Sequence, residues 1–322
     1  MRGPEVLVIG AGIAGLTSAV RLLESGRRVI VVSDQPVAAT TSFLAPGVWF
    51  PTGTQTGEQA LALSAATLAA LSAEAAAPGS AVVMRETLML YRAASGRPWW
   101  AAAIPDGVED ADPAGLPAGY SHGLRFRVPQ ALMPEYLPQL IERVRRLGGV
   151  VVAEHIPSLA AAAKRATVVV NCSGLAAREL AGDGAVFPIR GQIVRVANPG
   201  LRVSLRDEAH PEGRAYVHPR RDDCVLGGTA DAGSWDLRPD PATSESILRR
   251  CIGLAPELEG ARVLEHQVGL RPGRHAVRLE IDTEAAGEAT IIHNYGHGGA
   301  GVTLCWGCAD RVVTLLDSRW PD

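Results

Sequence analysis

The amino-acid sequence predicts an α/β protein in which a parallel-sheet domain is interrupted by a domain built on an antiparallel sheet. The prediction rests on a strand–turn–helix–strand unit over residues 5–34, short alternating strands between residues 191 and 237, and a glycine-rich turn at 298–303 before the last helix. The 322 residues, 47% of them hydrophobic, suffice for such cores. The expected domain bounds are 1–60, 130–190 and 262–322 for the first domain, and 61–129 and 191–261 for the second.

The first unit has the spacing of a nucleotide-binding turn. A strand at 6–9 leads into Gly10, Gly12 and Gly15, and a second strand ends at Asp34. In such a G-x-G-x-x-G pattern the glycines permit a tight turn, close approach of a phosphate and close helix packing, and the helix N-terminus faces a pyrophosphate. A carboxylate at the position of Asp34 can accept ribose hydroxyls. The pattern predicts a Rossmann-like unit with a bound dinucleotide; the alternative is a structural turn.

The remaining elements follow from hydrophobic spacing. Residues 40–47 are expected to form a polar loop, and residues 105–122, rich in Pro, Gly and Asp, another loop. Helices are expected at 58–77, 134–147, 244–254 and 302–316. Strands are expected at 82–92, 148–152, 166–171, 193–196, 215–218, 224–229, 262–270, 278–282 and 291–294.

Composition excludes several functional classes. A net charge of −3 with mixed signs gives no sign of nucleic-acid binding. No apolar stretch reaches the length of a membrane span, and the first strand begins too early for a signal peptide, so a cytoplasmic location is expected. The five cysteines are an odd number and are expected to be reduced. Cys305 and Cys308 form a C-x-x-C pair without a second pair or a histidine partner, which favours packing over a metal site.

Several strings together resemble the D-amino-acid oxidases, a flavoprotein family that includes D-aspartate oxidase. The matching strings span nearly the whole chain and include His293-Asn294-Tyr295-Gly296-His297-Gly298-Gly299-Ala300-Gly301-Val302-Thr303. The others are residues 8–16, 190–192, 215–220, 226–229, 268–272 and 277–280.

The resemblance implies FAD as the cofactor. It places Asp34 on the adenosine ribose, Val150 at the adenine through its backbone, and Ser173 beside a strand end near the flavin. Gln35 stands where the family has Arg, a change expected to loosen adenosine binding. The full set expected to bind FAD is Gly10, Ala11, Gly12, Ile13, Ala14, Gly15, Asp34, Gln35, Thr41, Ser42, Gly47, Val48, Val150, Ser173, Arg271, Gly298, Gly299, Ala300, Gly301, Val302 and Thr303.

The resemblance also implies a substrate site. Tyr216 and Arg271 would bind the α-carboxylate of the substrate, and the carbonyl of Gly299 would accept its amine. A guanidinium binds a carboxylate through two hydrogen bonds, and a phenol adds one donor. The alternatives are a structural ion pair for Arg271 and a core position for Tyr216.

Three departures bear on the choice of substrate. Phe50 replaces a Gln of the vertebrate members, which favours an apolar pocket. Arg206 stands where D-aspartate oxidases bind a side-chain carboxylate, but Ala230 replaces a second expected Arg. If Arg206 points to solvent, the pocket is neutral. The stretch 207–214, which corresponds to a lid, is short and lacks the tyrosine of the vertebrate enzymes, so open access is expected.

The resulting expectation is an FAD-dependent oxidase of D-amino acids, with neutral side chains favoured over acidic ones. Hydride transfer to flavin N5 would yield, with dioxygen and water, a 2-oxo acid, ammonia and hydrogen peroxide. The alternatives left open are a D-aspartate oxidase, a glycine- or sarcosine-type amine oxidase, a nicotinamide-dependent dehydrogenase and a non-catalytic flavin-binding protein. Family members often dimerise, and the residues leave a homodimer open.

Overall fold

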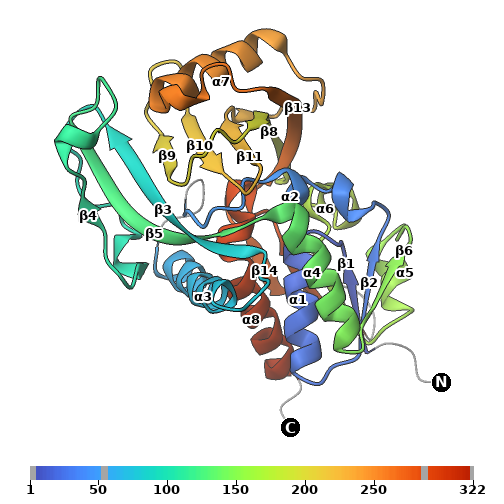
Figure 1. Cartoon of the computed structure of the whole chain (residues 1–322). Coiled ribbons are helices and arrows are strands. Elements are labelled where there is room, and N and C mark those ends of the chain that lie inside the picture. Colours follow the sequence, from blue (N-terminus) through green and yellow to red (C-terminus); the bar gives the residue numbers. More distant parts are fainter. Residues whose placement is uncertain (1–4, 52–56, 284–288, 320–322) are drawn as a thin grey trace. The chain divides into compact units, whose positions relative to one another are not determined.

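The computed structural model describes residues 5–51, 57–283 and 289–319, which fall into two compact units (Figure 1). The first unit comprises Met1–Ala70, Met133–Pro188 and Arg271–Asp322, and the second comprises Leu71–Leu132 and Ile189–Leu270. These bounds differ from the predicted domains mainly at 61–70 and 262–270. A helix, Glu58–Ala75, continues across the predicted boundary at 60/61, and most of the strand Val263–Gly273 belongs to the second unit.

The first unit contains a six-stranded sheet in the order β14-β15-β7-β1-β2-β6. All neighbouring pairs are parallel except β14 and β15. The central strands are continuous apolar runs because both faces of a parallel sheet are covered. The strands are β1 (Val6–Ile9), β2 (Val29–Ser33), β6 (Val150–Ala153), β7 (Val168–Asn171), β14 (Arg278–Ile281) and β15 (Thr290–Tyr295).

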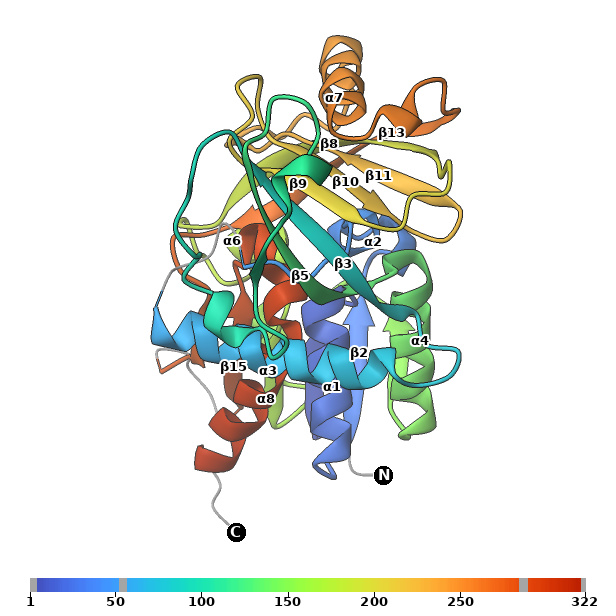
Figure 2. The same cartoon turned by 60° about the vertical axis from the view of Figure 1, so that its left-hand side comes forward.

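The helices of this unit include α1 (Ile13–Glu24) and α8 (Gly301–Arg319), which lie side by side (Figures 1 and 2). The Thr17 hydroxyl donates to the Cys305 carbonyl at 3.2 Å and joins these two helices. The Trp306 indole N–H donates to the Tyr136 hydroxyl at 3.0 Å and joins α8 to α4. The other helices are α2 (Thr41–Leu44), α4 (Met133–Arg146), α5 (Leu159–Ala163) and α6 (Ala177–Leu180), with 3-10 turns at Val37–Ala39, Gly174–Ala176 and Gly298–Ala300. Helix α3 (Glu58–Ala75) continues into the second unit.

The second unit is built on a nine-stranded sheet in the order β12-β8-β11-β10-β9-β3-β5-β4, with β13 paired to β8. Figure 2 shows the long pair β3 and β5. Neighbouring strands in this order are antiparallel except β3 and β9, which are parallel. The strands are β3 (Val82–Tyr91), β4 (Glu109–Asp110), β5 (His122–Ala131), β8 (Phe187–Ala197), β9 (Ser204–Asp207), β10 (Ala215–Pro219), β11 (Asp223–Gly227), β12 (Asp231–Ala232) and β13 (Val263–Gly273).

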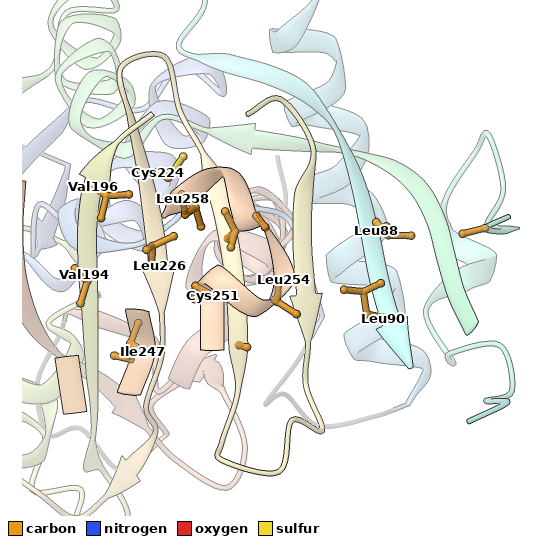
Figure 3. Packing of buried hydrophobic residues seen from close by; sticks show 14 residues of the cluster. Leu88, Leu90, Val194, Val196, Cys224, Leu226, Ile247, Cys251, Leu254 and Leu258 are labelled. Carbon is orange, nitrogen blue, oxygen red and sulfur yellow. The ribbon is translucent and has the colours of Figure 1, made fainter. Parts of the chain in front are cut away.

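One face of this sheet is packed against helix α7 (Pro241–Leu254) (Figure 3). Ile247, Cys251 and Leu254 of the helix meet Val194 and Leu226 of the strands. Because side chains alternate along a strand, residues one position away, such as Tyr216 beside Val217, face the opposite side of the sheet. That opposite face holds a smaller cluster of Ile193, Tyr216 and Val225.

The long predicted helices and strands are present, and the exceptions have local causes. Residues 40–47 include the short helix α2, and β5 and β9 were not predicted. Strand β5 contains Pro129, which normally argues against a strand. It fits because β4 pairs with β5 only at Leu124 and Arg125, so Pro129 lies where β5 has a single neighbour. No helix in the described ranges is long and apolar enough to cross a bilayer.

Candidate active site

The glycine turn after β1 is fixed by close backbone contacts. Gly10 has φ +106°, and a Cβ on it would lie 2.5 Å from the carbonyl oxygen of Cys172. A Cβ on Gly15 would lie 1.9 Å from the carbonyl oxygen of Gly10. These two positions require glycine, which confirms the packing role predicted for Gly15. The close approach also brings Ser173 next to the turn.

The N-terminus of α1 is the predicted phosphate-binding position. Its N-cap, Gly12, has no side chain, and the first turn contains no acidic residue. Ser42 of α2 accepts a hydrogen bond from the Ile13 N–H at 3.0 Å, and a Cβ on Gly12 would lie 3.2 Å from the same hydroxyl oxygen. An uncharged hydroxyl and a glycine at a helix N-terminus suit a pyrophosphate, because donors and the helix dipole both favour an anion. Thr41 lies on α2, and Gly47 and Val48 follow it.

Asp34 lies just beyond β2, and its carboxylate is about half exposed. The His155 ring, which the sequence analysis did not single out, lies 3.5 Å from that carboxylate through Nδ1. Val150 lies elsewhere: it pairs with Ile30 at the amino end of β6, whereas Ala153 pairs with Ser33 next to Asp34. Because ligands bind at the carboxyl ends of parallel strands, this placement argues against the predicted adenine contact of Val150.

The second glycine turn packs against the first. A Cβ on Gly301 would lie 3.6 Å from Ile13 Cγ2, which places the start of α8 against the start of α1. Gly298 has φ +55°, a conformation that favours glycine. The Thr303 hydroxyl accepts from the Phe50 N–H at 3.1 Å and donates to the Phe50 carbonyl at 3.0 Å. Thr303, which is predicted to bind FAD, is thus hydrogen-bonded to Phe50, which is predicted to bind the substrate.

Arg271 and Gly299 lie together in the first unit. A Cβ on Gly299 would be 3.7 Å from Arg271 Cδ. His297 precedes this turn, is buried, and its Nε2 makes no hydrogen bond among the described residues. Burial lowers the pKa of His297 to about 4. A cationic side chain beside an exposed backbone turn, with a neutral imidazole next to it, can bind a carboxylate and an amine.

Taken together, these positions fit an FAD molecule. The glycine-lined N-terminus of α1 would hold the pyrophosphate, Asp34 and His155 would hold the adenosine end, and the turn at 298–301 lies against the same helix terminus. A Cβ at Gly12 would reduce the space for a pyrophosphate between the N-terminus of α1 and Ser42.

In the second unit, Tyr216 lies across the backbone of two glycines. A Cβ on Gly227 would lie 2.0 Å from Tyr216 Cζ, and one on Gly228 would lie 2.7 Å from the Tyr216 hydroxyl. The His218 ring stacks on Tyr216 with 4.9 Å between centroids. Burial lowers the pKa of His218 well below its ordinary value, and the cations Arg206 and Arg85 lower it further. The imidazole is therefore neutral at physiological pH.

Arg206 is the direct cross-strand neighbour of Tyr216 and is only 6% exposed. Its guanidinium donates to Glu208 Oε1 from Nη2 at 2.6 Å and from Nε at 3.2 Å. The condition set for a neutral pocket, an Arg206 that points to solvent, is not met, because the side chain is buried on the Tyr216 face. The ion pair with Glu208 nevertheless leaves the pair with no net charge.

The same face contains further buried polar atoms. Thr87 Oγ1, Ser204 Oγ and His218 Nδ1 make no hydrogen bond within the described part of the chain. Thr87 and Ser204 are register partners on β3 and β9, and Ser204 lies two residues from Arg206. Buried polar atoms without partners are uncommon in stable cores, so this face has unused hydrogen-bonding capacity.

The loop at 207–214 is held at both ends. The Asp207 carboxylate, 1% exposed, pairs with Arg92 and accepts from the Tyr120 hydroxyl at 2.7 Å. Arg250 of α7 donates to the Glu212 carbonyl at 3.0 Å and to the Arg214 carbonyl at 3.2 Å. Ala230, Gly213 and Thr229 line a surface pocket of about 530 Å³. These contacts favour a fixed loop over a mobile lid.

Comparisons with known proteins agree with this arrangement. A family model described as DAO, FAD dependent oxidoreductase, matches residues 5–315. A D-amino-acid oxidase of Rubrobacter xylanophilus is 50% identical over 319 residues, covering 98% of this chain and 97% of that protein. A D-amino-acid oxidase of Streptomyces coelicolor is 44% identical over 98% of this chain and 97% of that protein. Human D-aspartate oxidase is 34% identical over 97% of this chain and 94% of that protein.

Solved structures show the same fold. Glycine oxidase from Geobacillus kaustophilus superposes with a TM-score of 0.79 at 17% identity, covering 99% of this chain and 95% of that one. The match of the family model over nearly the whole chain identifies the cofactor as FAD. The chain belongs to the DAO family of FAD-dependent oxidoreductases.

Proposed function

We propose that this protein is a D-amino-acid oxidase that acts on D-amino acids with neutral side chains. The activity rests on the identity of 50% and 44% to proteins named D-amino-acid oxidase, against 34% to a D-aspartate oxidase. The preference for neutral side chains rests on one observation, the buried ion pair in which Glu208 neutralises Arg206. The products would be a 2-oxo acid, ammonia and hydrogen peroxide.

Bound FAD supplies a two-electron acceptor that dioxygen reoxidises. The protein's own contribution is positioning. Arg271 is assigned to the α-carboxylate through two hydrogen bonds, and the Gly299 carbonyl to the substrate amine, because these two groups lie together in the first unit. Tyr216 is assigned as a further donor to the carboxylate. An amine that arrives neutral needs no side-chain base, which is consistent with the neutral state of His297.

Phe50 is assigned to the substrate's side chain. It is buried, and its backbone is fixed by Thr303 through two hydrogen bonds, so its position next to the second glycine turn is set by α8. An aromatic ring favours apolar substrate side chains through burial of surface. At the adenosine end, we assign the backbone after β6, at His155, in place of Val150.

A peroxide-coupled assay of the FAD-supplemented protein tests the proposal. The panel contains the D- and L-forms of valine, alanine and aspartate, together with glycine, sarcosine and an NAD-dependent control reaction. Peroxide from D-valine and D-alanine, with the L-forms silent, is the expected result. Peroxide from D-aspartate alone would change the assignment to D-aspartate oxidase. Peroxide from sarcosine or glycine alone would change it to an amine oxidase. A yellow protein that produces no peroxide from any compound of the panel would overturn the proposed activity.

A homodimer is also proposed, on the family resemblance alone, and a cytoplasmic location, on the sequence pattern alone. Sedimentation equilibrium of the FAD-loaded protein tests the first: a single species at twice the 33.8 kDa chain mass is expected, and a single species at the chain mass would contradict it. Fractionation of the producing cells tests the second.

A further inference from the structure

Arg206 lies directly beside Tyr216, so a substrate that contacts Tyr216 would also lie close to Arg206. The two residues are register partners on antiparallel strands β9 and β10, so their side chains leave the same face of the sheet and lie next to each other. The next pair along the strands, Leu205 and Val217, faces the α7 side instead. An unpaired arginine at this position would give the Tyr216 face a positive charge.

Glu208 removes that charge. It lies two residues after Arg206, on the same side of the chain, and one of its oxygens accepts both guanidinium hydrogen bonds. The carboxylate is itself mostly buried, with 20% of its side chain exposed. Its second oxygen lies 3.5 Å from Nε of Arg214 on the following loop. A buried cation must be paired, and here the partner is internal to the protein rather than a ligand.

The neighbouring acid cannot take this role. Asp207 points to the other side of the strand, where it pairs with Arg92 and Tyr120. His218, the other titratable group close to Arg206, is neutral because burial and the two arginines lower its pKa. Arg206 and Glu208 are therefore the oppositely charged pair directly beside Tyr216, while Arg85 is a further cation close to His218.

We propose that Glu208 is a specificity-determining residue that excludes acidic D-amino acids by occupying Arg206. A substrate whose side chain ends in a carboxylate would have to displace Glu208 from the guanidinium, and it would meet like-charge repulsion as it approached. A neutral side chain meets a pair without net charge. This inference rests on the proposed function, and it adds the residue that determines the substrate class.

The test is Glu208→Gln, which keeps the shape and an acceptor for Arg206 but removes the negative charge. The ratio of kcat/KM for D-aspartate to that for D-valine should rise about ten-fold or more, the size expected when a charge-assisted hydrogen bond becomes available. Glu212→Gln is the matched control. It removes the same charge four residues away, from an exposed pair with Arg249, and it should leave the ratio unchanged.

Two further variants connect the effect to Arg206. In the double variant Arg206→Met with Glu208→Gln, the gain for D-aspartate should disappear, because the guanidinium beside Tyr216 is gone. Glu208→Asp keeps the charge on a shorter side chain and should give a ratio between wild type and Glu208→Gln. It also serves as the test should Glu208→Gln lose bound FAD or unfold, and a wild-type ratio in Glu208→Asp would then overturn the proposal.

A binding measurement separates this inference from the activity itself. Succinate and 3-methylbutanoate resemble D-aspartate and D-valine without the amine, and their binding can be followed by the absorbance of bound FAD. Glu208→Gln should shift preference toward succinate about ten-fold. If wild type oxidises no D-amino acid, the proposed function fails while this shift still tests Glu208. If wild type oxidises D-valine and neither ratio changes in Glu208→Gln, the inference on Glu208 is wrong.

Discussion

The two units build their functional surfaces in different ways. In the first unit, the surface is backbone: Gly10, Gly12 and Gly15 at one turn and Gly298 and Gly301 at the other, packed against each other. In the second unit, the surface is made of side chains: Tyr216 stacked on His218, and Arg206 bound by Glu208. The surface of the first unit depends on glycine at fixed positions. The surface of the second unit depends on contacts between pairs of side chains.

This difference predicts different responses to mutation. A change at the glycine turns of the first unit should act on folding and on cofactor binding together, because the backbone that would contact the cofactor also packs the helices. A change in the second unit should act on substrate choice with little loss of cofactor, because the sheet is held by the α7 core on its opposite face. The predictions below test this contrast, in order of decreasing effect.

The largest effect is expected for Gly15→Ala. The new Cβ would lie 1.9 Å from the Gly10 carbonyl oxygen, a backbone atom that cannot move without opening the turn. We expect a loss of about 3 kcal/mol or more in the free energy of unfolding, with loss of bound flavin. Thermal unfolding and the visible absorbance of FAD measure both.

Gly253→Ala in α7 is the matched control, since it is also a helical glycine but has no atom within 4 Å of the added Cβ. It should gain about 0.5–1 kcal/mol from helix propensity and leave FAD binding unchanged. Equal effects of the two substitutions would contradict the close packing of the first turn.

The next effect is expected for Arg271→Ala. Removing the guanidinium should lower kcat/KM for D-valine roughly a thousand-fold, because the carboxylate loses a paired charge. Bound FAD should be retained, which would separate a substrate role from the cofactor role also expected for this residue. Arg271→Lys should recover only part of the activity, since an ammonium cannot reproduce the two-hydrogen-bond geometry. Normal affinity for D-valine in Arg271→Ala would contradict the assigned role.

The contrast between the units also explains what the sequence could predict. The glycine turns were predictable because a positive φ or a backbone contact permits few residue types, and the pattern is local. Arg206 was identified, but its partner was not, because β9 was not recognised as a strand. Once β9 is known, alternation along the strand separates Arg206 from Asp207. Glu208 lies just beyond the end of β9, in a turn, so its contact with Arg206 depends on the path of that turn.

The misplacement of Val150 has a similar cause. The strand itself was predicted, yet the functional end of a parallel strand is its carboxyl end, and Val150 begins β6. The end of the strand points instead to His155, whose ring lies near Asp34. Hydrophobic spacing predicts where a strand begins and ends. Which of its two ends can bind a ligand depends on the sheet, because ligands bind at the carboxyl ends of parallel strands.

A smaller effect concerns acid stability in the first unit. Burial lowers the pKa of His297 in the folded protein to about 4, below the 6.5 of an ordinary histidine. Between these values the unfolded chain binds the additional proton, so the free energy of unfolding should fall as the pH drops from 6.5 toward 4. The loss attributable to His297 is at most about 3 kcal/mol.

Denaturant unfolding of wild type and His297→Gln at pH 7, 5.5 and 4.5 measures this dependence. The variant should show a shallower loss, although not a flat one, because the pKa of the buried His218 in the second unit is also lowered. An equally steep pH dependence in both proteins would show that folding does not lower the pKa of His297.

The smallest effect compares two buried tyrosines, one from each unit. Tyr216→Phe keeps the ring on the Gly227 backbone and the stacking with His218, and removes one proposed donor to the substrate carboxylate. We expect KM for D-valine to rise roughly ten-fold, with kcat and the thermal unfolding temperature nearly unchanged. Tyr136→Phe removes the acceptor of the Trp306 indole N–H between α4 and α8.

This second substitution leaves a buried donor unpaired and should cost about 1–3 kcal/mol of stability, with KM unchanged. The same chemical change would then lower substrate affinity in the second unit and stability in the first. The opposite pattern, with a raised KM in Tyr136→Phe and a destabilised Tyr216→Phe, would show that the sheet face around Tyr216 is a structural core, and the substrate role of that face would have to be given up.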